Sequence, residues 1–142
     1  MASLTITAAD VGFSSDNLAL PTIKALAAMD QGVPFYVDSD GKAVPADVDT
    51  AAKATVKGIS MTPATAADDT IAYLPLDTAS SQGKRFYPGG TLVANRLYYL
   101  TGTGTIGEFA DLASTEYITP LFRAVDTAIA QVESQVTGLQ VA

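Results

Sequence analysis

The chain of 142 residues contains no cysteine and no histidine. Without cysteine it cannot form a disulfide framework, and without either residue it cannot build the usual zinc sites. The lack of histidine also removes the commonest general base and the commonest metal ligand. Because few residue types remain for chemistry, we expect no catalytic residue, no metal site and no bound cofactor, and we predict that the protein is not an enzyme.

Charge is scarce as well, and most of it is negative. Eight lysines and arginines face fifteen aspartates and glutamates, which gives a formal net charge of −7. An acidic chain repels phosphate, so we expect no nucleic-acid partner. Apolar residues make up 48% of the chain and charged residues only 16%. This composition is too apolar for a disordered tail and favours a surface that is buried against other proteins.

Long apolar runs are also missing. No run approaches the roughly eighteen residues that a membrane span requires, so we expect no membrane partner. The first ten residues, MASLTITAAD, lack the basic start and the apolar stretch of a secretion signal. The sequence therefore predicts a protein made in the cytoplasm without a signal peptide.

What the sequence does contain is frequent turns. Glycine-containing turns occur at 30–32, 39–41, 88–90 and 102–107, and short runs rich in Val, Ile, Thr, Tyr and Phe lie between them. This spacing is typical of an all-β sandwich or barrel with glycine-rich hairpins. The predicted strands are Leu4–Thr7, Thr22–Ala28, Val33–Asp38, Ala43–Pro45, Thr55–Thr62, Thr70–Leu76, Thr91–Val93 and Arg96–Thr101.

Two segments resemble each other and indicate an internal repeat. FYVDSDGKAVPADV at 35–48 and YYLTGTGTIGEFADL at 98–112 both begin with an aromatic pair, pass through a glycine-containing turn and end in Ala-Asp and an aliphatic residue. One inserted residue is needed in the second copy, and a β-rich run follows each. The repeat predicts two similar β units with hairpins at comparable places.

The last third of the chain carries two conflicting patterns. Apolar residues at 122, 125, 129, 132, 136 and 139 have helical and even heptad spacing, with Thr119 as N-cap, Pro120 at the first position and Gly138 after the end. The repeat and the frequent Thr, Val and Ile favour strand instead. We predict strand over 117–132 and keep a short C-terminal helix as the alternative.

An Asp-rich stretch at 38–49 resembles the start of a calcium-binding EF-hand loop. Counted from Asp38, however, Lys42 and Ala43 stand where an oxygen ligand and a glycine belong, and Asp49 replaces the bidentate Glu. Asp-Gly at 40–41 suits the positive φ angles of a type I′ turn instead. We therefore predict a hairpin turn and no metal site.

The segment GTGTIG at 102–107 matches the glycine pattern of a dinucleotide-binding loop. Glu108 and Asp111 follow it and would repel a pyrophosphate, and too little chain remains for further βαβ units. We predict a glycine-rich hairpin there. The segment SSQGKR at 80–85 lacks the spaced glycine of a P-loop, and we interpret it as a flexible loop that exposes Lys84 and Arg85.

Two carboxylate pairs could in principle serve a glycosidase, namely Asp47 with Asp49 and Asp68 with Asp69. Nothing in the sequence places an aromatic-walled cleft around them, so we expect them in polar loops. The aromatic pairs at 35–36 and 98–99 should place one ring on each face of a strand, one in the core and one partly exposed. The outward ring could instead contact another subunit, because Tyr is enriched at interfaces.

Four segments together resemble one known class of proteins. GVPFYVDSDGKAVPA, TVKGISMTPATAADDTIAYL, PGGTLVANRLYYLTGTGTIG and YITPLFRAVD are similar to the small β-rich decoration, or cement, proteins on the capsids of tailed bacteriophages. The resemblance covers about residues 17–132. Phe122-Arg123 departs from it, since a glycine is frequent there, and so does the longer tail after Val132.

The resemblance implies a structural virion protein. Such proteins bind the outer surface of an icosahedral phage head, often as homotrimers, and clamp neighbouring major capsid subunits without a cofactor. It also implies an N-terminal arm over residues 1–16, which is nearly uncharged, ahead of a single β-rich domain over 17–142. The alternative is a phage tail or receptor-binding β domain that recognises cell-surface glycan, for which a pocket of aromatic and carboxylate groups would be needed.

Overall fold

The computed structural model describes residues 4–13 and 20–142, and this part of the chain is all-β, as predicted. Its regular elements are eleven strands and three short 3-10 helices. They are η1 (Ala8–Asp10), β1 (Gly12–Phe13), β2 (Thr22–Lys24), β3 (Pro34–Val37), β4 (Ala43–Pro45), β5 (Gly58–Ser60), β6 (Thr70–Pro75), η2 (Ala79–Ser81), β7 (Arg85–Tyr87), β8 (Leu97–Leu100), β9 (Ile106–Gly107), η3 (Phe109–Asp111), β10 (Pro120–Ala124) and β11 (Ala130–Val132).

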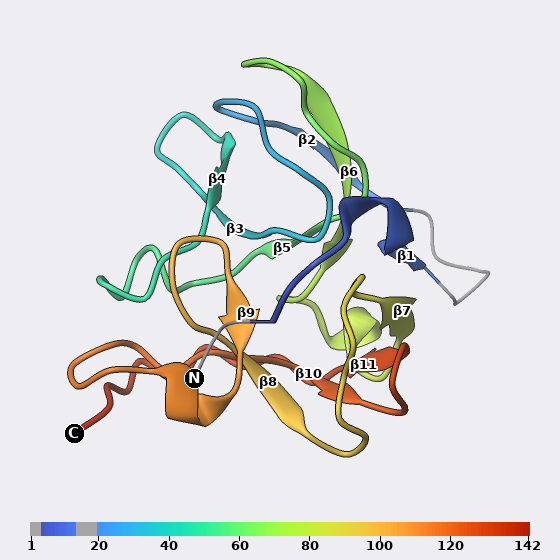
Figure 1. Cartoon of the computed structure of the whole chain (residues 1–142). Helices are drawn as coiled ribbons and strands as arrows, with labels where there is room; N and C mark the ends of the chain where they lie inside the picture. The colour runs from blue at the N-terminus through green and yellow to red at the C-terminus, as the bar shows by residue number, and fades with distance from the viewer. Residues whose placement is uncertain (1–3, 14–19) are drawn as a thin grey trace.

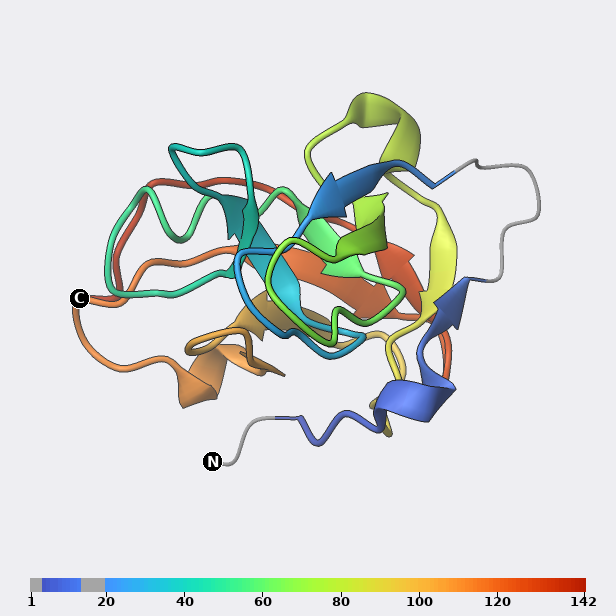
Figure 2. The ribbon, with the colours of Figure 1, turned by 90° about the horizontal axis from the view of Figure 1, so that it is seen from above.

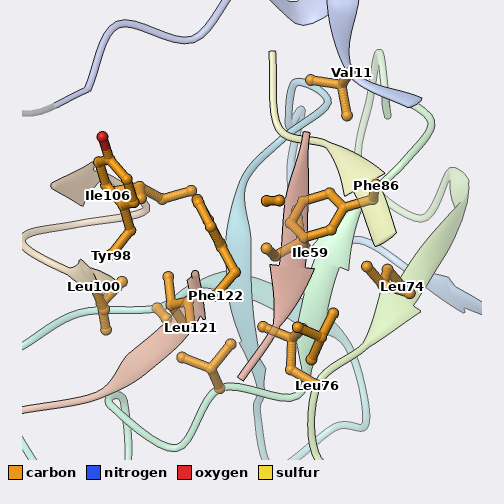
Figure 3. Packing of buried hydrophobic residues seen from close by; sticks show 14 of the residues in the cluster. Val11, Ile59, Leu74, Leu76, Phe86, Tyr98, Leu100, Ile106, Leu121 and Phe122 are labelled. Atoms are coloured by element: carbon orange, nitrogen blue, oxygen red, sulfur yellow. The ribbon is translucent and has the colours of Figure 1, made fainter. Parts of the chain in front are cut away.

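The strands form two antiparallel sheets. One has six strands in the order β1-β7-β11-β10-β8-β9, and the other has five in the order β2-β6-β5-β3-β4 (Figure 1). Their facing sides share the main core, where Phe86, Leu100 and Phe122 of the first sheet meet Ile59 and Leu74 of the second (Figure 3). Each of these side chains is fully buried, so the two sheets form a sandwich.

The five-stranded sheet also curls toward a barrel. Ala25, directly after β2 at one edge, forms a parallel bridge to Ala43 in β4 at the other edge. The backbone N–H of Leu26 donates to the carbonyl of Ala43 at 3.0 Å. Inside the curl lies a second core that includes Phe35 and Tyr73, whose rings meet edge to face. The sequence left sandwich and barrel open, and this protein has features of both.

The internal repeat is present as a repeat of topology. In one sheet β3 pairs with β4 and β5, β5 pairs with β6, and β6 pairs with β2. In the other sheet β8, β9, β10, β11 and β7 take the same places in the same order. Val37 pairs with Ala43 as Leu100 pairs with Ile106. The hairpins therefore match residue for residue, and the inserted residue of the second copy falls after them.

The C-terminal third forms strands, so the helical alternative is wrong. β10 and β11 are joined by a turn in which the Asp126 carboxylate accepts hydrogen bonds from the N–H groups of Ala128 and Ile129, both at 2.8 Å. This turn breaks the apparent heptad in its middle. Val136 and Leu139, its last members, are exposed at 51% and 63%. Thr119, the proposed N-cap, is buried and its hydroxyl donates to the carbonyl of Ala54.

Three local predictions are also wrong. Residues 4–7 and 91–93 form no strand, although both segments have β-prone composition. The predicted loop at 80–85 contains η2 and ends in β7, because Phe86 enters the main core and draws its neighbours into the sheet. Strand β7 had been missed because only three residues with one buried side chain show no periodicity.

Gly58 in β5 is required by close packing between the strands. A Cβ atom there would lie 2.6 Å from the carbonyl oxygen of Leu74 and 2.6 Å from the ring of Tyr73. We predict that Gly58→Ala lowers the free energy of unfolding by about 1–3 kcal/mol through overpacking. Urea denaturation measures this effect. Gly12→Ala is the matched control, because a Cβ in β1 would approach nothing closer than 3.8 Å; equal losses in both variants would contradict the explanation.

Candidate interaction surfaces

The Asp-rich stretch is a hairpin turn, as predicted, but its type is different. The N–H of Gly41 donates to the carbonyl of Asp38 at 3.1 Å, and Gly41 alone takes a positive φ, of 78°. Asp40 is not in the left-handed region, so the turn is a type I turn followed by a glycine bulge and not type I′. The Asp38 carboxylate accepts hydrogen bonds from the N–H groups of Asp40 and Lys42. The carboxylate thus stabilises the turn.

The second hairpin repeats this geometry. The N–H of Thr101 donates to the carbonyl of Thr105, and Gly104 takes a φ of 67° at the place of Gly41. The N–H of Gly104 also donates to the carbonyl of Ala46 at 2.7 Å, and a Cβ atom at 104 would lie 3.0 Å from Val33. The GTGTIG glycines therefore allow a tight turn and a close approach to the first hairpin. No α-helix follows them: the next element is η3.

The paired carboxylates also hold the backbone in place. Asp68 forms an ion pair with Lys42, and Asp69 accepts three hydrogen bonds from Thr65 and Ala66. Asp49 lies 3.8 Å from Lys53 at the surface. Asp47 accepts hydrogen bonds from the N–H of Val48 and from the hydroxyl of Thr103. These bonds assign structural roles to the residues considered for a glycosidase.

The aromatic pairs are arranged as the strand pattern predicts. Phe35 and Tyr98 are buried, whereas Tyr36 and Tyr99 are half-buried on the opposite faces of β3 and β8. The ring of Tyr99 contacts the exposed ring of Phe109 edge to face, with 5.5 Å between the centroids. Contact of an outward ring with another subunit stays a prediction.

The described part of the N-terminal segment is docked on the six-stranded sheet. Leu4 donates from its N–H to the carbonyl of Ile106 in β9, and Thr7 donates to Gly89 in the loop before β8. Val11 is buried in the main core, and β1 then pairs with β7. Figure 1 shows this blue segment crossing from β9 to β1. Sequence reasoning found no core position in the segment, and Val11 is one; residues 1–3 and 14–16 of the predicted arm lie outside the described residues.

Two hollows follow this docked segment. One, of about 640 Å³, is lined by Asp10, Tyr87 and residues of the loop before β8; the other, of about 340 Å³, is lined by Val93, Glu108 and others. Thr5 and Thr91 line both hollows, so the two lie next to each other along this segment, and together we call them the N-terminal groove. In Figure 2 the turn of η1 lies beside the yellow loop that precedes β8. Residues of η1 and of this loop line the larger hollow.

A third hollow, of about 340 Å³, lies beside the C-terminal strand-like tail. Val56, Leu76 and Val136 supply its apolar lining. The tail is held by backbone bonds between Ile118 and Leu139, and by Gln82, whose side chain bonds to Ser134. Val136 lines this hollow and is exposed, and Leu139, farther along the same tail, is exposed as well. We call these two side chains and the hollow the C-terminal apolar site.

Within residues 4–13 and 20–142 the structure contains no group of three or more acidic residues that could hold a metal ion. Nor does any helix in these ranges have the length and apolar character to cross a membrane. Neither a scan against models of known protein families nor a search of curated proteins finds a match to the chain.

Asp126 provides a test of how carboxylates stabilise this fold. Its carboxylate accepts hydrogen bonds from two backbone N–H groups, and these bonds lower the pKa of Asp126 below its ordinary value of 3.8. The positive charge of Arg85 makes a smaller contribution in the same direction. A lowered folded-state pKa adds stability above the ordinary value, which is lost as the pH falls through the folded pKa. Asp126→Asn keeps both hydrogen bonds but cannot titrate.

We therefore predict that Asp126→Asn melts at a lower temperature than the unmodified protein at pH 7, and that the difference shrinks as the pH falls below about 4. Thermal melts followed by circular dichroism between pH 7 and pH 2 would measure this. Asp30→Asn, at another exposed carboxylate, is the control. A difference that stays constant over the whole range would contradict the role assigned to Asp126.

Proposed function

We propose that the protein is a capsid decoration protein that binds the outer surface of a bacteriophage head and joins neighbouring major capsid subunits. The segments that carry the sequence resemblance support this. Two of the four form the matched hairpins β3–β4 and β8–β9, another forms β5 and β6, and the last contains β10. The resemblance therefore lies in the framework of the fold. A homotrimer is part of the same proposal, and equilibrium sedimentation would measure it.

The observation that carries the proposal is the C-terminal apolar site. Leu139 is 63% exposed and Val136 is 51% exposed, on a tail held by backbone and side-chain hydrogen bonds. The hollow has a mixed lining, in which polar residues such as Asp77 and Gln82 accompany Leu76 and Val136. Exposed apolar side chains with polar groups around them are typical of protein-contact surfaces. Three backbone hydrogen bonds join residues 139–141 of this tail to residues 115–118, so the surface is presented by ordered backbone. A rigid surface loses little conformational entropy on docking.

One charged pair borders this site. Lys57 forms an ion pair with Asp77, which lines the hollow. The pKa of Lys57 is raised by its hydrogen bond to Asp77, which keeps this ammonium group charged and paired beside the C-terminal apolar site. Neutralised charges at the rim reduce the desolvation cost of binding to a capsid surface.

The test uses undecorated heads of the phage that encodes the chain. We predict saturable co-sedimentation of the full-length protein with these heads, and a higher temperature of head disruption, because a ligand that binds only the assembled lattice stabilises it by mass action. If the protein stays in the supernatant and the disruption temperature does not change, the proposal fails.

The contact surface is tested by Leu139→Asp, which places a charge in the C-terminal apolar site. We predict that the affinity for heads, measured by co-sedimentation, falls at least about tenfold, as expected when a charge is buried without a partner. Leu26→Asp is the matched control, since Leu26 is 43% exposed on the other sheet. Equal binding by the two variants would place the contact surface elsewhere.

A further inference from the structure

The N-terminal groove has the lining of a carbohydrate site. Tyr87 lies in the larger hollow with 37% of its surface exposed, and Asp10 lies in the same hollow. The hydroxyl groups of Thr7, Thr91 and Thr127 complete its polar lining. The volume, about 640 Å³, falls within the range of roughly 300–1,000 Å³ that is usual for small-molecule pockets.

The polar groups of this lining are available to a ligand. Within the part of the chain that the structure describes, the side chains of Asp10, Tyr87, Thr91 and Thr127 make no hydrogen bond to protein. This contrasts with the other aspartates considered above, which bind backbone N–H groups or lysines. A carboxylate and several hydroxyls, which donate and accept, match the paired donors and acceptors of sugar hydroxyl groups.

Two glycines shape the groove, and strand pairing fixes its aromatic residue. Tyr87 in β7 pairs with Gly12 in β1. A Cβ at Gly89 would lie 2.7 Å from the carbonyl of Thr7, and one at Gly90 would lie 2.9 Å from that of Thr5. These glycines let the N-terminal segment lie close against the loop before β8. The ring of Tyr87 is thus held on a strand, which suits stacking against the apolar face of a sugar ring.

The extent of the groove and its charge narrow the class of ligand further. The smaller hollow lies next to the larger one, with Thr5 and Thr91 lining both, and two adjacent hollows suit linked sugar units better than a single sugar. Glu108 and Asp111 line the smaller hollow, and Asp10 the larger. Glu108 is paired with Arg96, and Asp111 accepts the N–H of Glu108, so Asp10 is the carboxylate that a ligand in the groove meets. Its charge and the net charge of −7 disfavour anionic chains such as sialylated or sulfated glycans. They favour a neutral polysaccharide whose hydroxyls donate to Asp10.

We propose that the N-terminal groove binds a neutral polysaccharide, with Tyr87 stacking on one sugar ring and Asp10 accepting hydrogen bonds from its hydroxyls. The groove and the C-terminal apolar site share no lining residue. Glycan binding is therefore independent of the proposed binding to heads. A decoration protein with both activities would attach a phage head loosely to a glycan-coated surface.

The experiment exposes the full-length protein to an array of immobilised neutral and anionic oligosaccharides of two to six sugars, followed by titration calorimetry with those that bind. We predict binding to neutral chains, and weaker binding by about tenfold in Tyr87→Ala, since the stacking contact is lost. Tyr87→Phe should bind nearly as well as the unmodified protein because it keeps the ring. Asp10→Asn should also weaken binding without lowering the melting temperature.

Phe109→Ala is the matched control, because Phe109 is an exposed aromatic residue that does not line the groove. No binding to any neutral chain at millimolar concentration, or a preference for anionic chains, would overturn the proposal. Undiminished binding by Tyr87→Ala would also overturn it, by placing the glycan elsewhere. Co-sedimentation of Asp10→Asn with heads separates the two functions: unchanged co-sedimentation with lost glycan binding supports two separate sites, and loss of both would contradict their independence.

Discussion

The packing of Phe122 against its neighbours is the contact on which the rest of the structure depends. Its ring stacks on Tyr98 at 5.4 Å and meets Phe86 edge to face at 5.3 Å, so one side chain joins β10, β8 and β7 (Figure 3). These large rings are buried in the main core, which also contains side chains of the second sheet. A chain with no disulfide depends on such burial for its stability.

This core explains why the polar residues have structural roles. Strands of two to six residues are short, so the chain must turn often, and each turn leaves backbone groups to be satisfied. Asp38, Asp69 and Asp126 accept those N–H groups, and glycines take the positive φ angles. The acidic character of the chain follows in part from this use of aspartate in turns. Asp10 and Tyr87 differ because their side chains face the N-terminal groove.

Sequence reasoning reached the fold class, the hairpins and the repeat because each depends on local signals. Asp-Gly at 40–41 and the glycine at 104 mark turns whatever surrounds them. Sequence reasoning missed β7, because that strand forms only through the burial of Phe86 in the core. The helical pattern at 122–139 misled it, because the turn that Asp126 stabilises sends the chain back as a second strand. The groove could not be predicted, because Asp10 and Tyr87 are far apart in sequence and are brought together by the pairing of β1 with β7.

The repeat also explains where the groove lies. In both units the edge strands of the sheet carry backbone N–H and C=O groups that need partners, because open edges otherwise pair with other chains. In the first unit, Ala25 and Leu26 connect the edges themselves, through Ala43. In the second unit the N-terminal segment takes this role, since Leu4 bonds to β9 and β1 pairs with β7. Ten residues, 4–13, span what two span in the first unit, and this segment supplies part of the lining of the N-terminal groove. The groove for which we propose glycan binding thus lies where the second copy of the unit is closed by a separate segment.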